Sequence, residues 1–222
     1  NVLAYINRGI AKGKLGDFKG VIEDLSKAIE IDPKNAFVYS SRGLVKVKLG
    51  DHQGAIVDYS IAIEIDPRYA DAYSNRGIAK SKLGNYPAAI EDYSKAIGLN
   101  CNNFNVYYNR AIAKRTLGDY QGSISDYSMA IDLNPNDFNM YYKRGIAKKQ
   151  IRDYAGEIKD YTKSLELNPN SCRIYKNRGD AKKKVGDDLG CCNDYKKAAS
   201  LGHEGIAQWL SSQDGAWCRN MK

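Results

Sequence analysis

The sequence predicts an all-α array of stacked helical hairpins, and three recurring features support this prediction. One pattern of 34 residues, clearest at 70–103, is repeated in register along the chain. A Gly-Asp pair or a close variant lies in the middle of each copy, and Asp-Pro or Asn-Pro closes four of them. A fixed period of this length indicates one supersecondary unit stacked repeatedly, each copy burying its apolar face against the next.

Each copy should form two antiparallel helices. In the first copy we expect them at 2–15 and 18–30, separated by Gly16 and Asp17. Gly ends a helix readily, and the Asp side chain accepts hydrogen bonds from the free N–H groups of the next helix. The fifth copy has Arg152 in place of this Gly. The six predicted repeats are 2–35, 36–69, 70–103, 104–137, 138–171 and 172–205.

The two helices of a repeat should pack through small residues that face aromatic ones. In the third copy, Tyr73, Gly77 and Lys80 share one face of the first helix. Ala89 and Tyr93 form the matching face of the second helix. A Gly opposite a Tyr ring lets the two helices approach closely, so we expect this contact to form the centre of each hairpin.

The period and the motif resemble those of the tetratricopeptide repeat family. The family's opening aromatic residue is present at Tyr5, Tyr39, Tyr73, Tyr107, Tyr141 and Tyr175. Its small residue four positions later is present at Gly9, Gly43, Gly77, Ala111, Gly145 and Gly179. The resemblance, which is strongest to bacterial members, implies a right-handed superhelical solenoid of six repeats that acts as a protein–protein interaction scaffold.

The end of the chain departs from the repeat. Ile206, Trp209 and Leu210 are spaced as one face of a helix, so we expect residues 203–212 to form a capping helix over the last repeat. Residues 213–222 carry no pattern, and we expect them to form a loose tail.

The net charge is +8, with +2 in residues 1–103 (14 basic, 12 acidic) and +6 in residues 104–222 (20 basic, 14 acidic). No apolar run approaches the ~20 residues of a membrane span. We expect a cytoplasmic protein, with a periplasmic or organellar location left open. The chain starts at Asn1, inside a repeat and without Met, which also leaves open a missing upstream segment.

The five cysteines, Cys101, Cys172, Cys191, Cys192 and Cys218, form no CxxC pair, and we expect reduced thiols. A zinc site made of Cys191, Cys192 and His203 is the alternative. It is disfavoured because Cys192 occupies a position that is Ile in the five other copies, which indicates a core side chain. We therefore expect neither a metal site nor a cofactor.

An Arg and an Asp recur at fixed positions in all six copies. The Arg positions are Arg8, Arg42, Arg76, Arg110, Arg144 and Arg178. The Asp positions are Asp24, Asp58, Asp92, Asp126, Asp160 and Asp194. This matched register predicts internal ion pairs, since a guanidinium can donate two hydrogen bonds to one carboxylate. In the alternative interpretation, the Arg side chains face a groove and bind an anionic ligand.

The position before each Arg suggests a binding groove. It is Asn in four copies, whereas Ser41 and Lys143 occupy it in the others. This pattern is similar to the asparagine ladder of O-linked N-acetylglucosamine transferase, which grips a peptide backbone. An amide can donate and accept, so it can hold main chain of any sequence. Three residues later runs an aliphatic stripe that ends at Asp180. Alternatively, Asn is merely tolerated on a polar face, and the stripe packs between repeats.

The candidate groove adds aromatic and basic residues to the ladder and the stripe. Its residues are Asn7, Asn75, Asn109, Asn177, Ile78, Ile112, Ile146, Tyr108, Tyr142, Lys143, Lys149, Arg173 and Lys176. We predict that it binds an acidic, partly apolar segment of a partner protein, so that the chain serves as a scaffold or adaptor. The carboxylate clamp of chaperone-binding relatives is not matched, because Ile6, Ile10, Ser41 and Asp71 occupy its positions.

Two other classes of function are less well supported. Repeats of helical hairpins can bind single-stranded RNA, and the positive charge would help, but paired base-reading side chains are not evident. Nucleic acid is therefore the alternative partner. The sequence contains no catalytic constellation, phosphate-binding loop or metal-ligand spacing, so we do not expect an enzyme.

Overall fold

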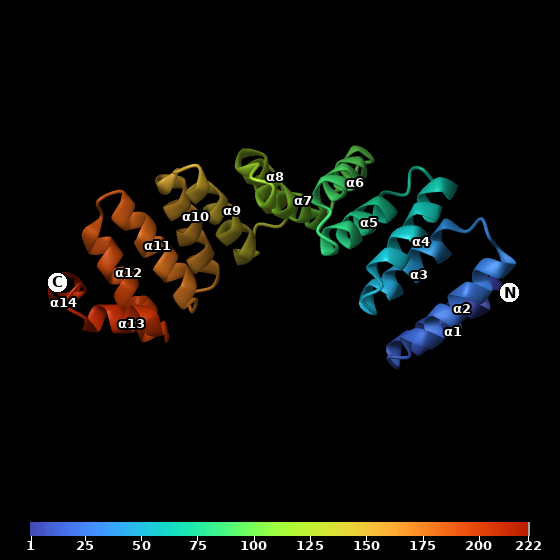
Figure 1. Cartoon of the computed structure of the whole chain (residues 1–222), viewed down its shortest axis with the longest axis horizontal. Coiled ribbons are helices and arrows are strands. Elements are labelled where there is room, and N and C mark those ends of the chain that lie inside the picture. The colour runs from blue at the N-terminus through green and yellow to red at the C-terminus, as the bar shows by residue number, and fades with distance from the viewer. Residues whose placement is uncertain (222) are drawn as a thin grey trace. The chain divides into compact units, whose positions relative to one another are not determined.

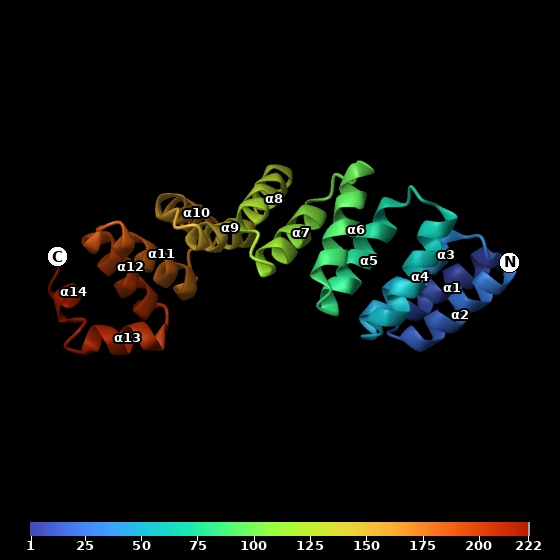
Figure 2. The ribbon, with the colours of Figure 1, turned by 45° about the horizontal axis from the view of Figure 1, so that its top comes forward.

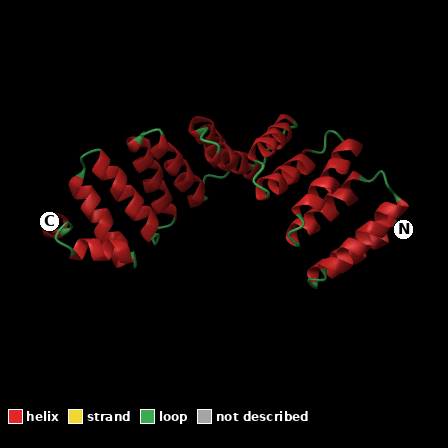
Figure 3. Cartoon of the chain, viewed as in Figure 1, coloured by secondary structure: helices red, strands yellow, loops and turns green. Residues whose placement is uncertain are grey.

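The computed structural model describes residues 1–221, which form fourteen α-helices and no β-strand (Figure 1). The predicted all-α class is confirmed. The chain divides into two compact units, Asn1–Leu117 and Gly118–Lys222. Within each unit the helices form hairpins joined by short loops, as Figure 3 shows.

The first unit contains three complete hairpins and one further helix. Its helices are α1 (Val2–Lys14), α2 (Phe18–Ile31), α3 (Ala36–Lys48), α4 (His52–Ile65), α5 (Ala70–Lys82), α6 (Tyr86–Gly98) and α7 (Phe104–Thr116). In the views of Figures 1 and 2 the partners of each hairpin lie side by side. The second helix of each hairpin also packs on the first helix of the next, so the apolar faces are covered on both sides.

The second unit is built in the same way and ends in two shorter helices. Its helices are α8 (Tyr120–Leu133), α9 (Phe138–Gln150), α10 (Tyr154–Leu167), α11 (Cys172–Lys184), α12 (Asp188–Ser200), α13 (Glu204–Ser211) and α14 (Ala216–Asn220). Helices α9 with α10 and α11 with α12 are hairpins, and α8 packs on α9.

The turn inside each hairpin follows from its two defining residues. Gly16 has a φ of 81°, a left-handed conformation that costs an L-residue with a side chain about 1–2 kcal/mol. Asp17 caps α2, since its carboxylate accepts from the Gly20 N–H at 2.9 Å. In the fifth copy the turn keeps this geometry without Gly, because Arg152 adopts a φ of 61°.

Tyrosine rings pack against glycine at the centre of the hairpins. A Cβ atom added to Gly77 would lie 2.8 Å from the Tyr93 ring, so the third copy has no room for a larger residue there. The first repeat is different because Leu25 takes the place of the Tyr. A Cβ on Gly9 would instead meet Val21 at 3.7 Å, an ordinary contact.

The end of the chain is more ordered than the sequence predicts. Ile206 of α13 is buried against α12 beside Tyr195, with Trp209 packed edge-on to the Tyr195 ring. The expected loose tail at 213–222 is wrong for residues 216–220, which form α14. Trp217 packs on Trp209, and Cys218 is fully buried, so apolar contact and a covalent bond order this segment.

The covalent bond is a disulfide between Cys192 of α12 and Cys218 of α14. The prediction that all five cysteines are reduced thiols is therefore wrong for Cys192 and Cys218. The other three, Cys101, Cys172 and Cys191, are free. It also removes Cys192 from the alternative zinc site, and His203 serves instead as the N-cap of α13. Disulfides are typical of oxidising compartments. The cytoplasmic location stays a prediction.

Candidate protein-binding surface

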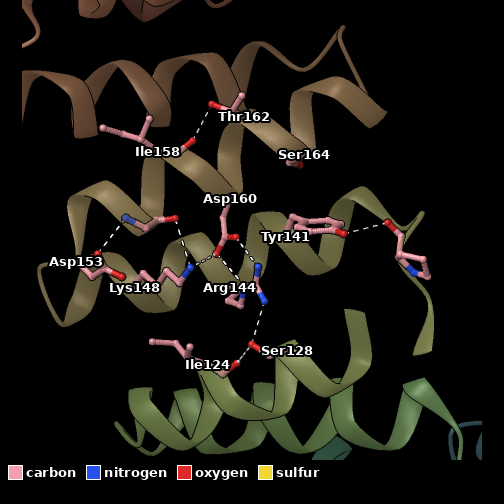
Figure 4. Close-up of polar contacts among 12 residues, drawn as sticks. Ile124, Ser128, Tyr141, Arg144, Lys148, Asp153, Ile158, Asp160, Thr162 and Ser164 are labelled. Carbon is pink, nitrogen blue, oxygen red and sulfur yellow. Dashed lines mark hydrogen bonds and ion pairs between the residues drawn. The ribbon is translucent and has the colours of Figure 1, made fainter. Parts of the chain in front are cut away.

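A buried polar frame fixes the two helices of each hairpin. In the fifth repeat, the Arg144 guanidinium donates through Nε and Nη2 to the two carboxylate oxygens of Asp160, at 2.9 and 2.7 Å (Figure 4). Lys148 Nζ lies 2.9 Å from Asp160 Oδ2. The Asp carboxylate is almost fully buried, so it needs both cations and the hydrogen bonds they donate.

The same frame recurs within both units, which confirms the predicted ion pairs there. The further pairs are Arg8 with Asp24, Arg42 with Asp58, Arg76 with Asp92, and Arg178 with Asp194. In the first repeat, the hydrogen bond from Arg8 lowers the pKa of Asp24 to about 2, although burial acts in the opposite direction. The sequence analysis did not predict that a Lys side chain also pairs with the Asp carboxylate of these frames.

The frames of Arg42, Arg76, Arg144 and Arg178 are also tied to the preceding repeat. Arg42 Nη1 donates to the Ser26 hydroxyl at 3.0 Å, and Arg144 donates to Ser128 in the same way. The sequence signal was present but unused, because Ser or Thr recurs at 26, 60, 94, 128 and 162. With the guanidinium enclosed by these partners, Arg42, Arg76, Arg144 and Arg178 are less than 20% exposed, which disfavours the anion-binding alternative.

A hollow recurs between consecutive first helices, and we call it the inter-repeat slot. Its first copy lies between α1, α2 and α3 and has a volume of about 390 Å³. Ile10, Phe18, Phe37 and Leu44 line it, and we name this copy the apolar slot. Leu25, which stands where the five other repeats carry a Tyr ring, also lines it.

The second copy, of about 340 Å³, lies between α5, α6 and α7. Ile78 and Ile112 line it at positions 68 residues, or two repeats, after Ile10 and Leu44. Asn109 borders the same hollow, so we call it the mixed slot. A candidate ladder residue and two stripe residues therefore meet here.

The third copy lies in the second unit, between α9, α10, α11 and α12, and has a volume of about 390 Å³. Tyr154 lines this copy and occupies the same repeat position as Phe18 of the apolar slot, which lies four repeats earlier in the chain. Glu157 and Asp180 replace the apolar residues Val21 and Leu44. We call this copy the charged slot.

Comparisons with known proteins bear directly on this repeated frame. Models of the tetratricopeptide repeat match residues 2–35, 70–102, 104–137 and 138–171, and a TPR repeat model matches residues 43–84. The chain belongs to the tetratricopeptide repeat (TPR) family. TPR proteins generally mediate protein–protein interactions, bind protein or peptide partners, and are typically not enzymes. A comparison with curated proteins finds no match.

Several solved TPR structures are similar to this chain. One is the crystal structure of YrrB, a TPR protein with an unusual peptide-binding site, with a TM-score of 0.77, 18% identity, and coverage of 85% of this chain and 98% of that chain. The crystal structure of the MamA protein has a TM-score of 0.71 and 25% identity, and the match covers 78% of this chain and 94% of that chain. The pilF protein of Pseudomonas aeruginosa has a TM-score of 0.75 and 19% identity, and the match covers 100% of this chain and 97% of that chain. These similarities establish the fold.

The remaining candidate residues of this TPR chain lie in several places. Asn7 is exposed, whereas Asn75, Tyr108 and Lys143 are half-buried. Ile146 packs in the core cluster around Tyr161. Of the stripe, the structure therefore places Ile78 and Ile112 beside a slot and Ile146 mainly between repeats.

The candidate residues of the second unit form a separate group. Asn177 donates to the Tyr142 hydroxyl at 3.2 Å, and Tyr142 and Arg173 line a further hollow of about 410 Å³. Lys149 lines the charged slot. Lys176 is engaged with Asp180, with 2.6 Å between Nζ and Oδ2.

The sequence reasoning considered only the first helices as the binding face, so it missed the slot residues that come from the second helices. Phe18, Tyr86 and Glu157 come from the first two turns of the second helices. The signal that could have found Glu157 is its position, which is Val21, Ala55, Ala89, Ser123 or Cys191 in the other copies. Among the described residues, no helix has both the length and the apolar character needed to cross a membrane.

Proposed function

We propose that this TPR chain is a scaffold or adaptor that holds a segment of a partner protein along the face of its first helices. The observation that carries the proposal is the recurrence of the inter-repeat slot at the same repeat positions in both units. Within the first unit, the apolar slot and the mixed slot offer two sockets that are two repeats apart, which suits an extended or helical segment whose anchoring side chains are similarly spaced.

The chemistry of the face supports such a ligand. Ile10 and Leu44 are each about half exposed in the apolar slot, where they can bury an aliphatic or aromatic side chain. The amide of Asn109, beside the mixed slot, can hold main chain. Exposed basic residues such as Lys149 and Arg173 would attract acidic residues of the segment. The similarity of fold to YrrB, described as having a peptide-binding site, is consistent with this function.

Affinity should be moderate, with a Kd of ~1–100 μM, because a flexible segment loses entropy on docking. The test uses the full chain as bait and measures the affinity of any recovered protein. Replacing Asn75, Asn109 and Asn177 together by Ala should weaken binding about tenfold or more without unfolding the array. The matched control replaces Asn105 and Asn193, exposed residues outside the proposed ladder, and should leave the affinity unchanged.

Single-stranded RNA remains the competing partner in this experiment. An RNA-binding array would show a steep dependence of affinity on salt and would depend on Tyr108 and Tyr142 for base stacking. Sub-micromolar RNA binding at physiological salt, together with failure to recover any protein, would replace the proposal.

A further inference from the structure

The charged slot contains a carboxylate without a partner. Glu157 is 1% exposed, and neither of its side-chain oxygens has a hydrogen-bond partner among residues 1–221. The Tyr161 hydroxyl lies close enough to influence the pKa of Glu157 but does not reach hydrogen-bond geometry. A buried, unpaired carboxylate is costly, and such groups are normally paired or protonated.

Two acidic residues enter this one slot from different repeats. Glu157 replaces the small or apolar residues found at its position in the other copies. Asp180 replaces an aliphatic residue, which is Ile10, Leu44, Ile78, Ile112 or Ile146 elsewhere. Asp180 is held in place, because the Tyr195 hydroxyl donates to its Oδ1 at 2.7 Å and Lys176 Nζ to its Oδ2 at 2.6 Å. The slot therefore has acidic residues on two of its walls.

The groups around Glu157 define its electrostatic environment. Burial raises the pKa of Glu157 to about 7, although Lys149 acts to lower it. The charged or titratable groups that line the slot come from α9, the following turn, α10, α11 and α12. They are Lys149, Arg152, Tyr154, Asp180, Lys183, Lys184 and Tyr195, with Asp153 capping α10 beside them. The four basic residues of the slot are exposed, so solvent screens their charges more than the charge of Glu157. They are Lys149, Arg152, Lys183 and Lys184.

We propose that the charged slot accepts a basic side chain, Lys or Arg, of the bound protein segment, with Glu157 as its buried counter-charge. This inference rests on the proposed function and specifies the chemistry of its partner. The Tyr154 and Tyr195 rings line the slot and suit the apolar stem of such a side chain. Because the exposed rim is basic, the residues flanking the inserted side chain should be acidic.

When the slot is empty and the pH lies below the pKa of Glu157, a proton takes the place of the basic side chain on this carboxylate. Insertion of the cation therefore releases this proton, and affinity for the basic side chain increases as pH rises toward the pKa of Glu157. A metal ion would need further ligands. Among the described residues no group of three or more His, Cys, Asp or Glu side chains could hold one.

The test uses a pair of labelled peptides with the full chain. One carries a single lysine flanked on each side by alanine and two acidic residues, and its twin carries norleucine in place of the lysine. At pH 8 we expect the lysine peptide to bind at least about tenfold tighter, because it alone neutralises the buried carboxylate. Glu157→Gln should abolish this preference and leave the norleucine peptide unaffected. Glu23→Gln, an exposed residue of α2, is the matched control and should keep the preference.

A pH series measures a second quantity, the pH dependence of the affinity for the lysine peptide. A purely structural role of Glu157 would not produce this dependence. Between pH 8 and pH 6 the affinity of the lysine peptide should fall about tenfold, while that of its twin stays constant. Equal affinities for the two peptides, failure of both to bind, or a preference that survives Glu157→Gln overturns the inference. If a recovered partner depends on Asn75 and Asn109 but not on Glu157, the proposed function stands and only the slot assignment falls.

Discussion

The apolar slot and the charged slot occupy equivalent places on the same hairpin frame, and their linings have opposite chemistry. In the apolar slot, Val21, Leu25 and Leu44 form an aliphatic lining. In the charged slot, Glu157 and Asp180 occupy the positions of Val21 and Leu44. The first repeat of each slot has the same ion pairs of Arg, Asp and Lys, which join Arg8 and Lys12 to Asp24 in one and Arg144 and Lys148 to Asp160 in the other. The backbone is thus fixed by one set of positions, while a second set is free to define what each slot binds.

The largest expected effect comes from breaking the common frame. Arg76→Leu leaves Asp92 buried beside Lys80 alone, and it should lower the free energy of unfolding by about 3 kcal/mol in a urea titration. Adding Asp92→Leu should recover much of that loss, since no buried carboxylate then remains. A double-mutant cycle with purely additive losses would show that the pair is not a unit.

The next effect distinguishes the two slots by their response to pH. Glu157 titrates near 7 in the folded protein, above its usual value of 4.5 because of burial. Between these values the folded state binds the extra proton, so stability falls as pH rises from 5 to 7 and levels off above 7. Relative to Glu157→Gln, the wild type should lose on the order of 2 kcal/mol between pH 5 and pH 8. Parallel stability curves for the two proteins would contradict the assignment.

A smaller effect on stability should follow when Leu25 of the apolar slot is replaced by the Tyr that the other repeats carry at this position. Leu25→Tyr alone should cost roughly 1–3 kcal/mol, because Val21 already occupies the space beside Gly9. Combined with Val21→Ala, it reproduces the arrangement of Ala55 and Tyr59 in the second repeat and should be nearly neutral. The double variant should also lose binding of a small apolar probe such as indole. Probe binding that persists after the ring fills the space would show that the probe occupies another surface.

The smallest effect concerns the turn that borders the charged slot. Arg152 adopts positive φ where the equivalent turn of the first repeat has Gly16. Arg152→Gly should therefore raise the free energy of unfolding by about 1 kcal/mol. Arg152→Ala is the control, since it removes the charge but keeps the Cβ atom. An equal gain from both variants would place the effect in the charge and not in the backbone.

The sequence was sufficient to predict the fold because the period carries most of the information. The turn at Gly16 and Asp17, and the contact of Gly77 with Tyr93, each follow from local chemistry repeated in register. The pairing of Arg76 with Asp92 was predictable for the same reason. Such features recur, and a chance match is improbable when it is repeated along a chain.

Features that occur once were harder to predict. The bond between Cys192 and Cys218 joins residues 26 apart in the sequence, and the tail that contains Cys218 has no periodicity to place it. Glu157 was overlooked because the binding face was assigned to first helices only, whereas the slot floor comes from second helices. The sequence predicts the repeated scaffold well, and the departures from the repeat are where three-dimensional information was needed.

The disulfide gives this array a direction in which it opens. Stacked repeats fray from their ends, where a hairpin has only one neighbour. Cys218 of α14 is linked to Cys192 of α12, and the Trp209 and Trp217 rings of α13 and α14 pack together, which restrains fraying on that side. In α1, Arg8 is 58% exposed, and among residues 1–221 it has no hydroxyl contact like that of Ser26 with Arg42. Under oxidising conditions the amides of α1 should therefore exchange with deuterium well before those of α12, and reduction should narrow the difference.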